Sequence, residues 1–294
     1  MRPLLFSLPG NADLSRKICA VLGAEYGELQ VRRFPDGESH LRYATEIKDR
    51  NVILVCTLDR PDEKTVALYL AACIARELGA RSVGLVLPYL AYMRQDARFN
   101  PGEGISSAHF ARLIAGVADW MVTIDPHLHR HASLDEIYHI PTRVAHAAPA
   151  ISAWIKAEID HPVVIGPDGE SEQWAAAVAN AAGCPFTVLQ KIRRGDRDVE
   201  VSVPDPALLE GRTPVLVDDI ASTARTMIAA VGHLARMGAT APVCVAVHPI
   251  FADDAHVALQ RAGAVRIASC NTIVHASNAI DIAPQLAAEI ADLL

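Results

Sequence analysis

The segment 214–226, PVLVDDIASTART, holds the most specific group of reactive side chains in the sequence. Two adjacent carboxylates, Asp218 and Asp219, follow an apolar run that predicts a buried strand. The hydroxyl residues that come next, at the expected start of a helix, are Ser222, Thr223 and Thr226. Ligands of parallel α/β sheets bind at the carboxyl ends of the strands, and the free N–H groups of a helix N-terminus suit a phosphate.

The two carboxylates cannot themselves bind a phosphate, because carboxylate and phosphate are both negatively charged. They suit sugar hydroxyls or a divalent cation, so the segment as a whole predicts a sugar-phosphate site. The alternative is that Asp219 or Ser222 serves only as the N-cap of the helix. A cap would explain one residue and leave the acidic pair unexplained.

Six short motifs occur in order along the chain. They are FPDGE at 34–38, RQD at 94–96, DPH at 125–127, PD at 167–168, KIR at 191–193 and VDD at 217–219. This series resembles the ribose-phosphate pyrophosphokinase (phosphoribosyl pyrophosphate synthetase) family. The segment 214–226 resembles the phosphoribosyl-pyrophosphate-binding loop of type I phosphoribosyltransferase folds. The similarity extends from about Phe34 to Ala283.

The resemblance implies a ribose 5-phosphate site at the acidic pair and the residues after it. Asp218 and Asp219 would hold the ribose hydroxyls together with magnesium. The residues expected to cradle the 5-phosphate are Ser222, Thr223, Ala224, Arg225 and Thr226. The family commonly has Asp and Gly where this chain has Ser222 and Arg225. Ser222 is a suitable phosphate donor, whereas Arg225 either adds positive charge or crowds the phosphate.

Two further motifs predict an ATP site. Arg94 follows an expected strand at 82–87, where a guanidinium can fork onto phosphate oxygens. The resemblance implies that Arg94 and Gln95 contact ATP, with Asp96 nearby; the alternative for Arg94 is a solvated surface residue.

Phe34 offers a stacking face for adenine beside two possible acceptors for its amino group, Asp36 and Glu38. In the family this hairpin reaches the ATP site of a neighbouring subunit, which implies a homo-oligomer, either a dimer or a hexamer. The alternative is a simple turn at Asp36-Gly37.

The segment DPHLHRH at 125–131 resembles a metal-binding cluster, because alternating histidines of an extended chain point to one side. By resemblance only His127 matches the metal-binding histidine of the family, acting with Asp168 on Mg²⁺. For His129 and His131 we expect polar loop residues, with a zinc site as the alternative.

Lys191 and Arg193 follow an expected strand at 187–190 and open a charged segment. Two cations on one loop can close over a phosphoryl-transfer transition state, and the resemblance implies that catalytic role. The alternative is a solvated hairpin.

The elements that must position these residues alternate between strands and helices. Expected strands at 51–56, 82–87 and 120–124 alternate with expected helices at 61–78 and 106–117, which is typical of a parallel sheet flanked by helices. A strand at 214–217, a helix at 222–237 and a strand at 243–247 repeat this plan. We therefore predict an α/β protein of two tandem phosphoribosyltransferase type I-like domains, 1–144 and 145–294, with the final helix, 282–294, able to pack on the N-terminal domain.

The composition and the distribution of charge disfavour several classes of protein. The 294 residues include 27 basic and 34 acidic ones, a net charge of −7 that disfavours nucleic-acid binding. Charge-free stretches are too short for a membrane span, the N-terminus is a poor signal peptide, and the six scattered cysteines are typical of free thiols. These features favour a cytoplasmic location.

Together these observations predict transfer of the diphosphoryl group of ATP to ribose 5-phosphate, with Mg²⁺ and without a covalent nucleophile. The alternatives are a phosphoribosyltransferase and a non-catalytic regulatory paralogue. The acidic turn at 169–174, where the family often has a Gly-rich turn and an Arg, keeps the regulatory alternative open.

Overall fold

The computed structural model describes residues 2–128, 130–194, 198–202 and 206–294. The side chains of residues 170, 190–194, 198–202 and 206 lie outside this description. The chain divides into two compact units. The first comprises Met1–His146 and Ala283–Leu294, and the second comprises Ala147–Ile282.

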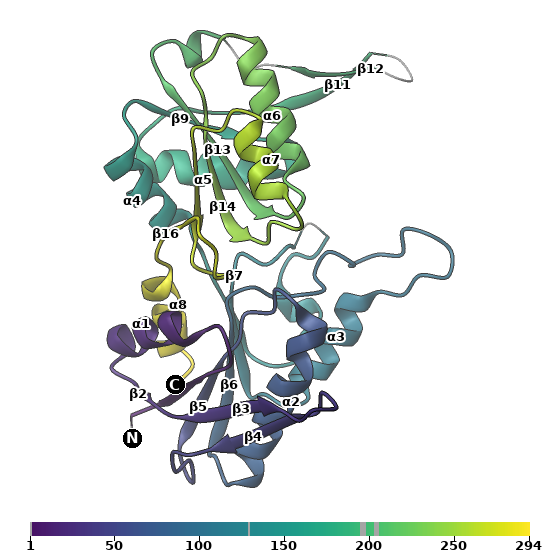
Figure 1. Ribbon diagram of the computed structural model, residues 1–294, viewed down its shortest axis with the longest axis vertical. Coiled ribbons are helices and arrows are strands. Elements are labelled where there is room, and N and C mark those ends of the chain that lie inside the picture. Colours follow the sequence, from purple (N-terminus) through teal and green to yellow (C-terminus); the bar gives the residue numbers. More distant parts are fainter. Residues whose placement is uncertain (1, 129, 195–197, 203–205) are drawn as a thin grey trace. The chain divides into compact units, whose positions relative to one another are not determined.

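The first unit is built on a parallel six-stranded sheet of order β2-β1-β5-β6-β7-β8 (Figure 1). Its strands are β1 (Leu4–Ser7), β2 (Glu25–Tyr26), β5 (Asn51–Val55), β6 (Ser82–Leu87), β7 (Trp120–Ile124) and β8 (Thr142–Ala145). Two further strands, β3 (Leu29–Arg33) and β4 (Ser39–Tyr43), form an antiparallel hairpin.

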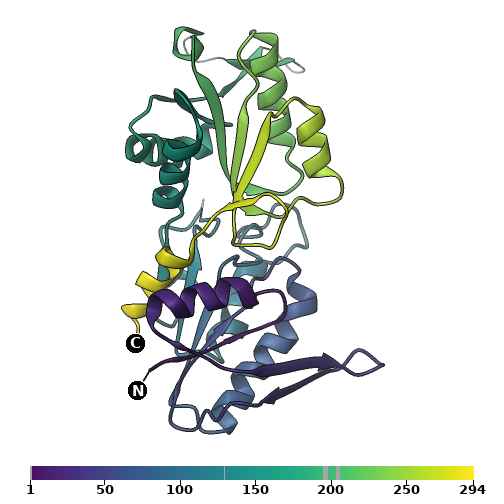
Figure 2. The ribbon, with the colours of Figure 1, turned by 60° about the vertical axis from the view of Figure 1, so that its left-hand side comes forward.

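Helices cover both faces of this sheet (Figure 2). On one face α1 (Ala12–Leu22) packs with α8 (Ala283–Ala291), and on the other lie α2 (Pro61–Glu77) and α3 (Ser106–Ala115). Pro61 begins α2 at a position where its missing N–H costs nothing. A short 3₁₀ turn, Leu134–Glu136, precedes β8.

The second unit repeats this topology with a parallel sheet of order β10-β9-β13-β14-β15-β16. Its strands are β9 (Pro162–Gly166), β10 (Phe186–Val188), β13 (Thr213–Ala221), β14 (Val243–Pro249), β15 (Arg266–Cys270) and β16 (Asn278–Ile280). The hairpin of β11 (Gln190–Arg194) and β12 (Asp198–Ser202) occupies the place in the chain order that β3 and β4 have in the first unit.

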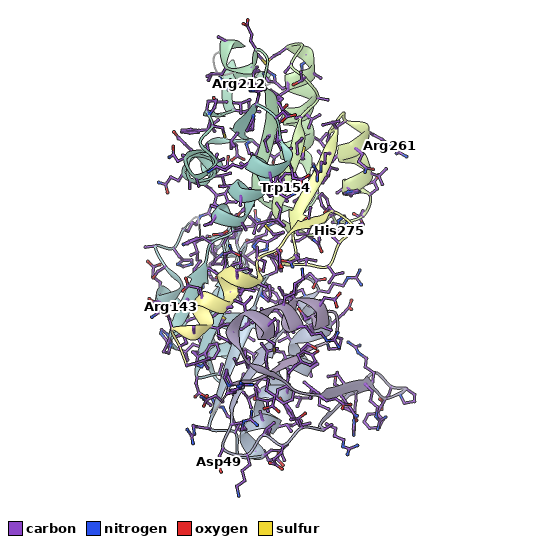
Figure 3. The ribbon with its side chains drawn as sticks, turned by 90° about the vertical axis from the view of Figure 1, so that its left-hand side faces the viewer. Asp49, Arg143, Trp154, Arg212, Arg261 and His275 are labelled. Atoms are coloured by element: carbon purple, nitrogen blue, oxygen red, sulfur yellow. The ribbon has the colours of Figure 1, made fainter. Side chains whose placement is uncertain are left out.

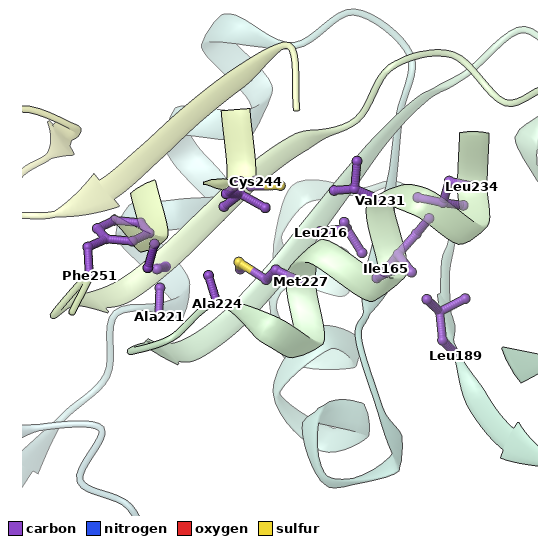
Figure 4. Packing of buried hydrophobic residues seen from close by; sticks show 14 of the residues in the cluster. Ile165, Leu189, Leu216, Ala221, Ala224, Met227, Val231, Leu234, Cys244 and Phe251 are labelled. Atoms are coloured by element: carbon purple, nitrogen blue, oxygen red, sulfur yellow. The ribbon is translucent and has the colours of Figure 1, made fainter. Parts of the chain in front are cut away.

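In the second unit α4 (Ala148–Glu158) and α5 (Glu172–Ala182) pack on one face of the sheet, and α6 (Arg225–Arg236) and α7 (Ala255–Arg261) on the other (Figure 2). Short 3₁₀ turns are Gly169–Ser171 and Pro206–Leu209. Buried side chains of β13, β14 and α6 interlock in the core beneath α6 (Figure 4).

The predicted α/β class with two parallel sheets flanked by helices is confirmed. Two expected bounds are wrong. The strand expected to end at 217 continues to Ala221, so the helix begins at Arg225 and not at 222. The strand expected at 187–190 is divided between β10 and β11. No helix in the described part of the chain is both long and apolar enough to span a membrane.

Candidate active site

The acidic pair lies within β13, near its carboxyl end, and not after the strand as expected. The carboxylate of Asp218 accepts a hydrogen bond from the N–H of Asp219 at 3.1 Å, and that of Asp219 accepts one from the N–H of Ile220 at 2.7 Å. These bonds hold both side chains against their own backbone. The strand continues past them because Ile220 and Ala221 still pair with β14.

A third carboxylate, Asp168, follows the neighbouring strand β9. The Asp168 carbonyl accepts a hydrogen bond from Ser171 Oγ at 2.6 Å, which fixes the turn into α5. Burial, and then the charges of Asp219 and Asp168, raise the pKa of Asp218 well above its ordinary value. The site therefore collects negative charge that a divalent cation or hydroxyl donors would stabilise.

The acidic turn 169–174 forms a 3₁₀ turn, Gly169–Ser171, followed by the start of α5. Gly166, just before it, has no room for a side chain, because a Cβ there would lie 2.5 Å from Ser171 Oγ. The indole N–H of Trp174 is buried and has no acceptor among the described residues.

The residues expected to hold the phosphate connect β13 to α6. The N-cap residue of α6 is Ala224, with a left-handed φ of 53°, and no side chain caps the helix. The alternative that Asp219 or Ser222 acts as the N-cap is therefore wrong. Thr223 and Arg225 are exposed, while Ser222 and Thr226 are partly buried. The first N–H groups of α6 are consequently left for a ligand or solvent.

Lys191 and Arg193 lie on β11, where they pair across the hairpin with Val201 and Val199. Alternate positions of a strand share one face, so the two residues belong to the same face of this hairpin. Their side chains lie outside the described part of the structure, and their catalytic role remains a prediction.

In the first unit the expected ATP-binding motif 94–96 lies on the loop between β6 and α3. Arg94 is exposed, and the Gln95 side-chain oxygen accepts a hydrogen bond from the Ser106 hydroxyl. The Asp96 side chain is fully buried and accepts a hydrogen bond from Arg130 Nη1 at 2.9 Å. Asp96 thus ties this loop to the loop after β7, a link between residues 34 apart that the sequence analysis missed.

Phe34, Asp36 and Glu38 form the exposed tip of the β3–β4 hairpin. The Phe34 ring lies 4.7 Å from the Arg32 guanidinium carbon and packs edge-on to the His40 imidazole with a 5.6 Å centroid separation. Gly37, with a φ of 96°, closes the turn. The tip therefore presents an aromatic ring beside two carboxylates, and its role in adenine binding remains a prediction.

His127 is partly buried on the loop after β7 in the first unit, whereas its predicted partner Asp168 belongs to the second unit. Their joint metal site remains a prediction. His131 is hydrogen-bonded to Glu136 at 2.9 Å, and His129 lies outside the described residues. No three metal-binding side chains gather at one point among the residues that the structure describes.

Comparison with known proteins identifies the family. Residues 4–117 match the N-terminal domain of ribose phosphate pyrophosphokinase, and residues 133–285 match the phosphoribosyl transferase domain. The ribose-phosphate pyrophosphokinase of Methanothermobacter thermautotrophicus is 31% identical over 97% of this chain and 98% of its own length. That of Methanopyrus kandleri is 33% identical over 96% and 97%.

A phosphoribosylpyrophosphate synthetase from Mycobacterium smegmatis has the same fold. Its crystal structure matches with a TM-score of 0.86 at 23% identity and covers 100% of this chain and 99% of its own. The two domain matches and the near full-length relatives agree with the series of motifs in the sequence. The chain belongs to the ribose-phosphate pyrophosphokinase family.

Proposed function

We propose that this protein transfers the diphosphoryl group of ATP to the 1-hydroxyl of ribose 5-phosphate, forming 5-phosphoribosyl 1-pyrophosphate and AMP. The observation that supports this most strongly is the order of groups along β13 and into α6. Two carboxylates near the end of a central strand are followed, after residues 220–224, by a helix N-terminus without a side-chain cap. The carboxylates suit ribose hydroxyls, and the helix N-terminus suits a phosphate on the same sugar.

In the proposed reaction the 1-hydroxyl oxygen of ribose 5-phosphate attacks the β-phosphorus of ATP. The bond between the β-phosphorus and the oxygen that bridges it to the α-phosphorus breaks. AMP leaves with that oxygen, and the hydroxyl proton is released. Asp218 and Asp219 orient the ribose, and residues 222–226 hold its 5-phosphate. This fixed orientation lowers the entropic part of the barrier.

The remaining roles concern the nucleotide. Arg94 binds phosphate oxygens of ATP, with Gln95 beside it, and Lys191 and Arg193 stabilise the charge on the transferring group. The exposed tip at Phe34, with Asp36 and Glu38, receives the adenine of a nucleotide bound to a neighbouring copy in a homo-oligomer.

The donor chemistry of the second unit fits magnesium. Asp168, Asp218 and Asp219 offer the carboxylate oxygens that Mg²⁺ prefers, and their mutual repulsion is relieved by a cation. Asp168 is the proposed ligand in this unit, and His127 of the first unit is proposed from the family resemblance alone. When bound, Mg²⁺ would neutralise phosphate charge on ATP. We place the protein and this reaction in the cytoplasm.

The test is AMP release by the purified protein with ATP and Mg²⁺, with and without ribose 5-phosphate. We expect AMP only when ribose 5-phosphate is present, and its loss in Lys191→Ala. Lys156→Ala is the matched control, because Lys156 is exposed on α4 and has no proposed role. No AMP, with ribose 5-phosphate still raising the melting temperature, would contradict this function and favour a non-catalytic paralogue.

A further inference from the structure

The segment that follows β14 runs beside the expected phosphate loop and is hydrogen-bonded to it. The N–H of Phe251 donates to the Ala221 carbonyl at 2.8 Å, and the N–H of Ala252 donates to the Ser222 carbonyl at 3.0 Å. These two acceptors immediately precede Thr223. The backbone at 251–252 is therefore bonded directly to the end of β13 and to the first residue of the loop 222–226.

Both segments also contain a residue with a strained backbone. Phe251 has a φ of 39° and Ala224 a φ of 53°, values in the left-handed region that residues with a Cβ rarely adopt. Such conformations persist only where the surrounding packing and hydrogen bonds hold them in place. Contacts of Phe251 must therefore hold its backbone in this conformation.

The packing of the Phe251 side chain holds its backbone in this conformation. The side chain is 8% exposed and belongs to the core cluster that includes Ala221, Ala224 and Met227 (Figure 4). Two imidazoles also pack against the ring, His275 at a centroid distance of 4.8 Å and His256 at 5.1 Å. The two imidazoles also contact each other, with centroids 4.9 Å apart.

His275 is itself held in one orientation on the connection between β15 and β16 (Figure 3). Its Nδ1 accepts a hydrogen bond from the backbone N–H of Ser277 at 3.1 Å. The Ser277 hydroxyl also lies within hydrogen-bond distance of Nδ1, at 2.8 Å. The backbone N–H of His275 donates to the side-chain oxygen of Asn278 at 3.0 Å. Burial and the neighbouring His256 lower the pKa of His275, which agrees with a neutral ring packed on Phe251.

We propose that Phe251 is a positioning residue for the ribose 5-phosphate loop: its ring, packed against the core cluster and the imidazoles of His256 and His275, fixes the Ala221 and Ser222 carbonyls and thereby the N–H groups that receive the 5-phosphate. This inference rests on the proposed function of that loop. Phe251 acts on the substrate only through the loop.

The test compares Phe251→Leu, which removes the ring and retains an apolar side chain, with the unmodified protein. We expect the KM for ribose 5-phosphate to rise by about tenfold, corresponding to about 1.4 kcal/mol of binding free energy. The KM for ATP should stay unchanged. Calorimetric titration of ribose 5-phosphate without ATP should show the same loss of affinity. His256→Phe, which keeps an aromatic ring at that position, should retain the unmodified KM values.

Val231→Ala is the matched control, because Val231 is fully buried in the same core but lies in the middle of α6. It should lower the melting temperature without changing either KM. If Phe251→Leu lowers the melting temperature while affinity for ribose 5-phosphate is kept, or raises both KM values equally, the positioning role is wrong. If the unmodified protein neither binds nor uses ribose 5-phosphate, the proposed function itself fails.

Discussion

The carboxylate of Asp218 is repelled by two neighbouring carboxylates. Its carboxyl is partly buried beside Asp219 and Asp168, so ionisation is opposed both by loss of hydration and by like charge. In the protein without ligand this arrangement is unfavourable. A site of this kind persists because its charge is used when substrate or cation binds.

We expect Asp218→Asn to stabilise the protein and to impair its reaction. Removing the charge should raise the melting temperature by about 2–4 °C, the shift expected for ~1 kcal/mol in a chain or unit of this size class. The same change should lower kcat/KM for ribose 5-phosphate by about 100-fold or more, because a charged contact to the ribose is lost. Thermal unfolding and AMP release measure the two effects.

Asp160→Asn is the control for this pair of measurements, since Asp160 is an exposed acid of the same unit outside the site. It should alter neither property. A fall in the melting temperature of Asp218→Asn would show that the repulsion inferred at this site is absent.

Arg130 compensates the buried charge of Asp96. The Asp96 side chain has no solvent exposure, and its second oxygen, Oδ2, has no partner among the described residues. Arg130→Met should therefore lower the free energy of unfolding by about 1–3 kcal/mol, because a buried carboxylate loses its donor. The double variant Arg130→Met/Asp96→Asn should regain most of this loss in urea unfolding. Equal losses in the single and double variants would mean that the unpaired carboxylate of Asp96 is not the cause of the loss.

Some site residues could be predicted from sequence and others could not. Asp218 and Ser222 lie within one contiguous strand-to-helix segment, so chain order alone places them near each other. Arg130 and Phe251 act through partners 34 and 30 residues away, and no local pattern joins such pairs. Their contacts become visible only when the loops of the fold are assembled.

At the scale of elements, the buried strands were the most predictable. β5 and β6 are continuous apolar runs covered on both faces, and their expected bounds differ from the observed ones by no more than one residue. The end of β13 could not be predicted, because its last residues include two acids whose backbone still pairs with β14. The expected strand ended where the polar residues begin. In the structure the backbone hydrogen bonds to β14 extend the strand to Ala221.

Gly84 in β6 is an element-scale feature that packing explains. It pairs with Trp120 of β7, and a Cβ at Gly84 would lie 2.0 Å from the indole ring. Gly84→Ala should therefore lower the free energy of unfolding by about 1–3 kcal/mol through overpacking. Gly104→Ala is the matched control, because nothing lies within 4 Å of its Cβ position. Chemical denaturation that finds the two variants equally stable would contradict this account of the strand pair.

At the scale of the whole molecule, each unit is completed by a helix that follows the last strand of the other. α4 follows β8 of the first unit but packs on α5 in the second, while α8 follows β16 of the second unit but packs on α1 in the first. This exchange accompanies the same strand order in both units. It fits a duplication in which both halves kept one plan.

The exchange makes the stability of the first unit depend on the end of the chain. Leu286 and Ile290 of α8 are fully buried, and α8 packs on α1, whose Leu14 and Ile18 are buried as well. Leu286→Ala should therefore destabilise the first unit by about 2–5 kcal/mol, the usual cost of such a cavity. Hydrogen exchange should become faster in β1 and α1 and remain slow in β14, because the second unit does not contain α8.

Ala288→Ser provides the comparison, because Ala288 is exposed on the same helix and its change should cost only about 0.5 kcal/mol of helix propensity. Removal of residues 283–294 should exaggerate the effect of Leu286→Ala in the same elements. If exchange instead accelerates first in β14 and α6, the final helix stabilises the second unit, and the reciprocal exchange of helices between the units is wrong.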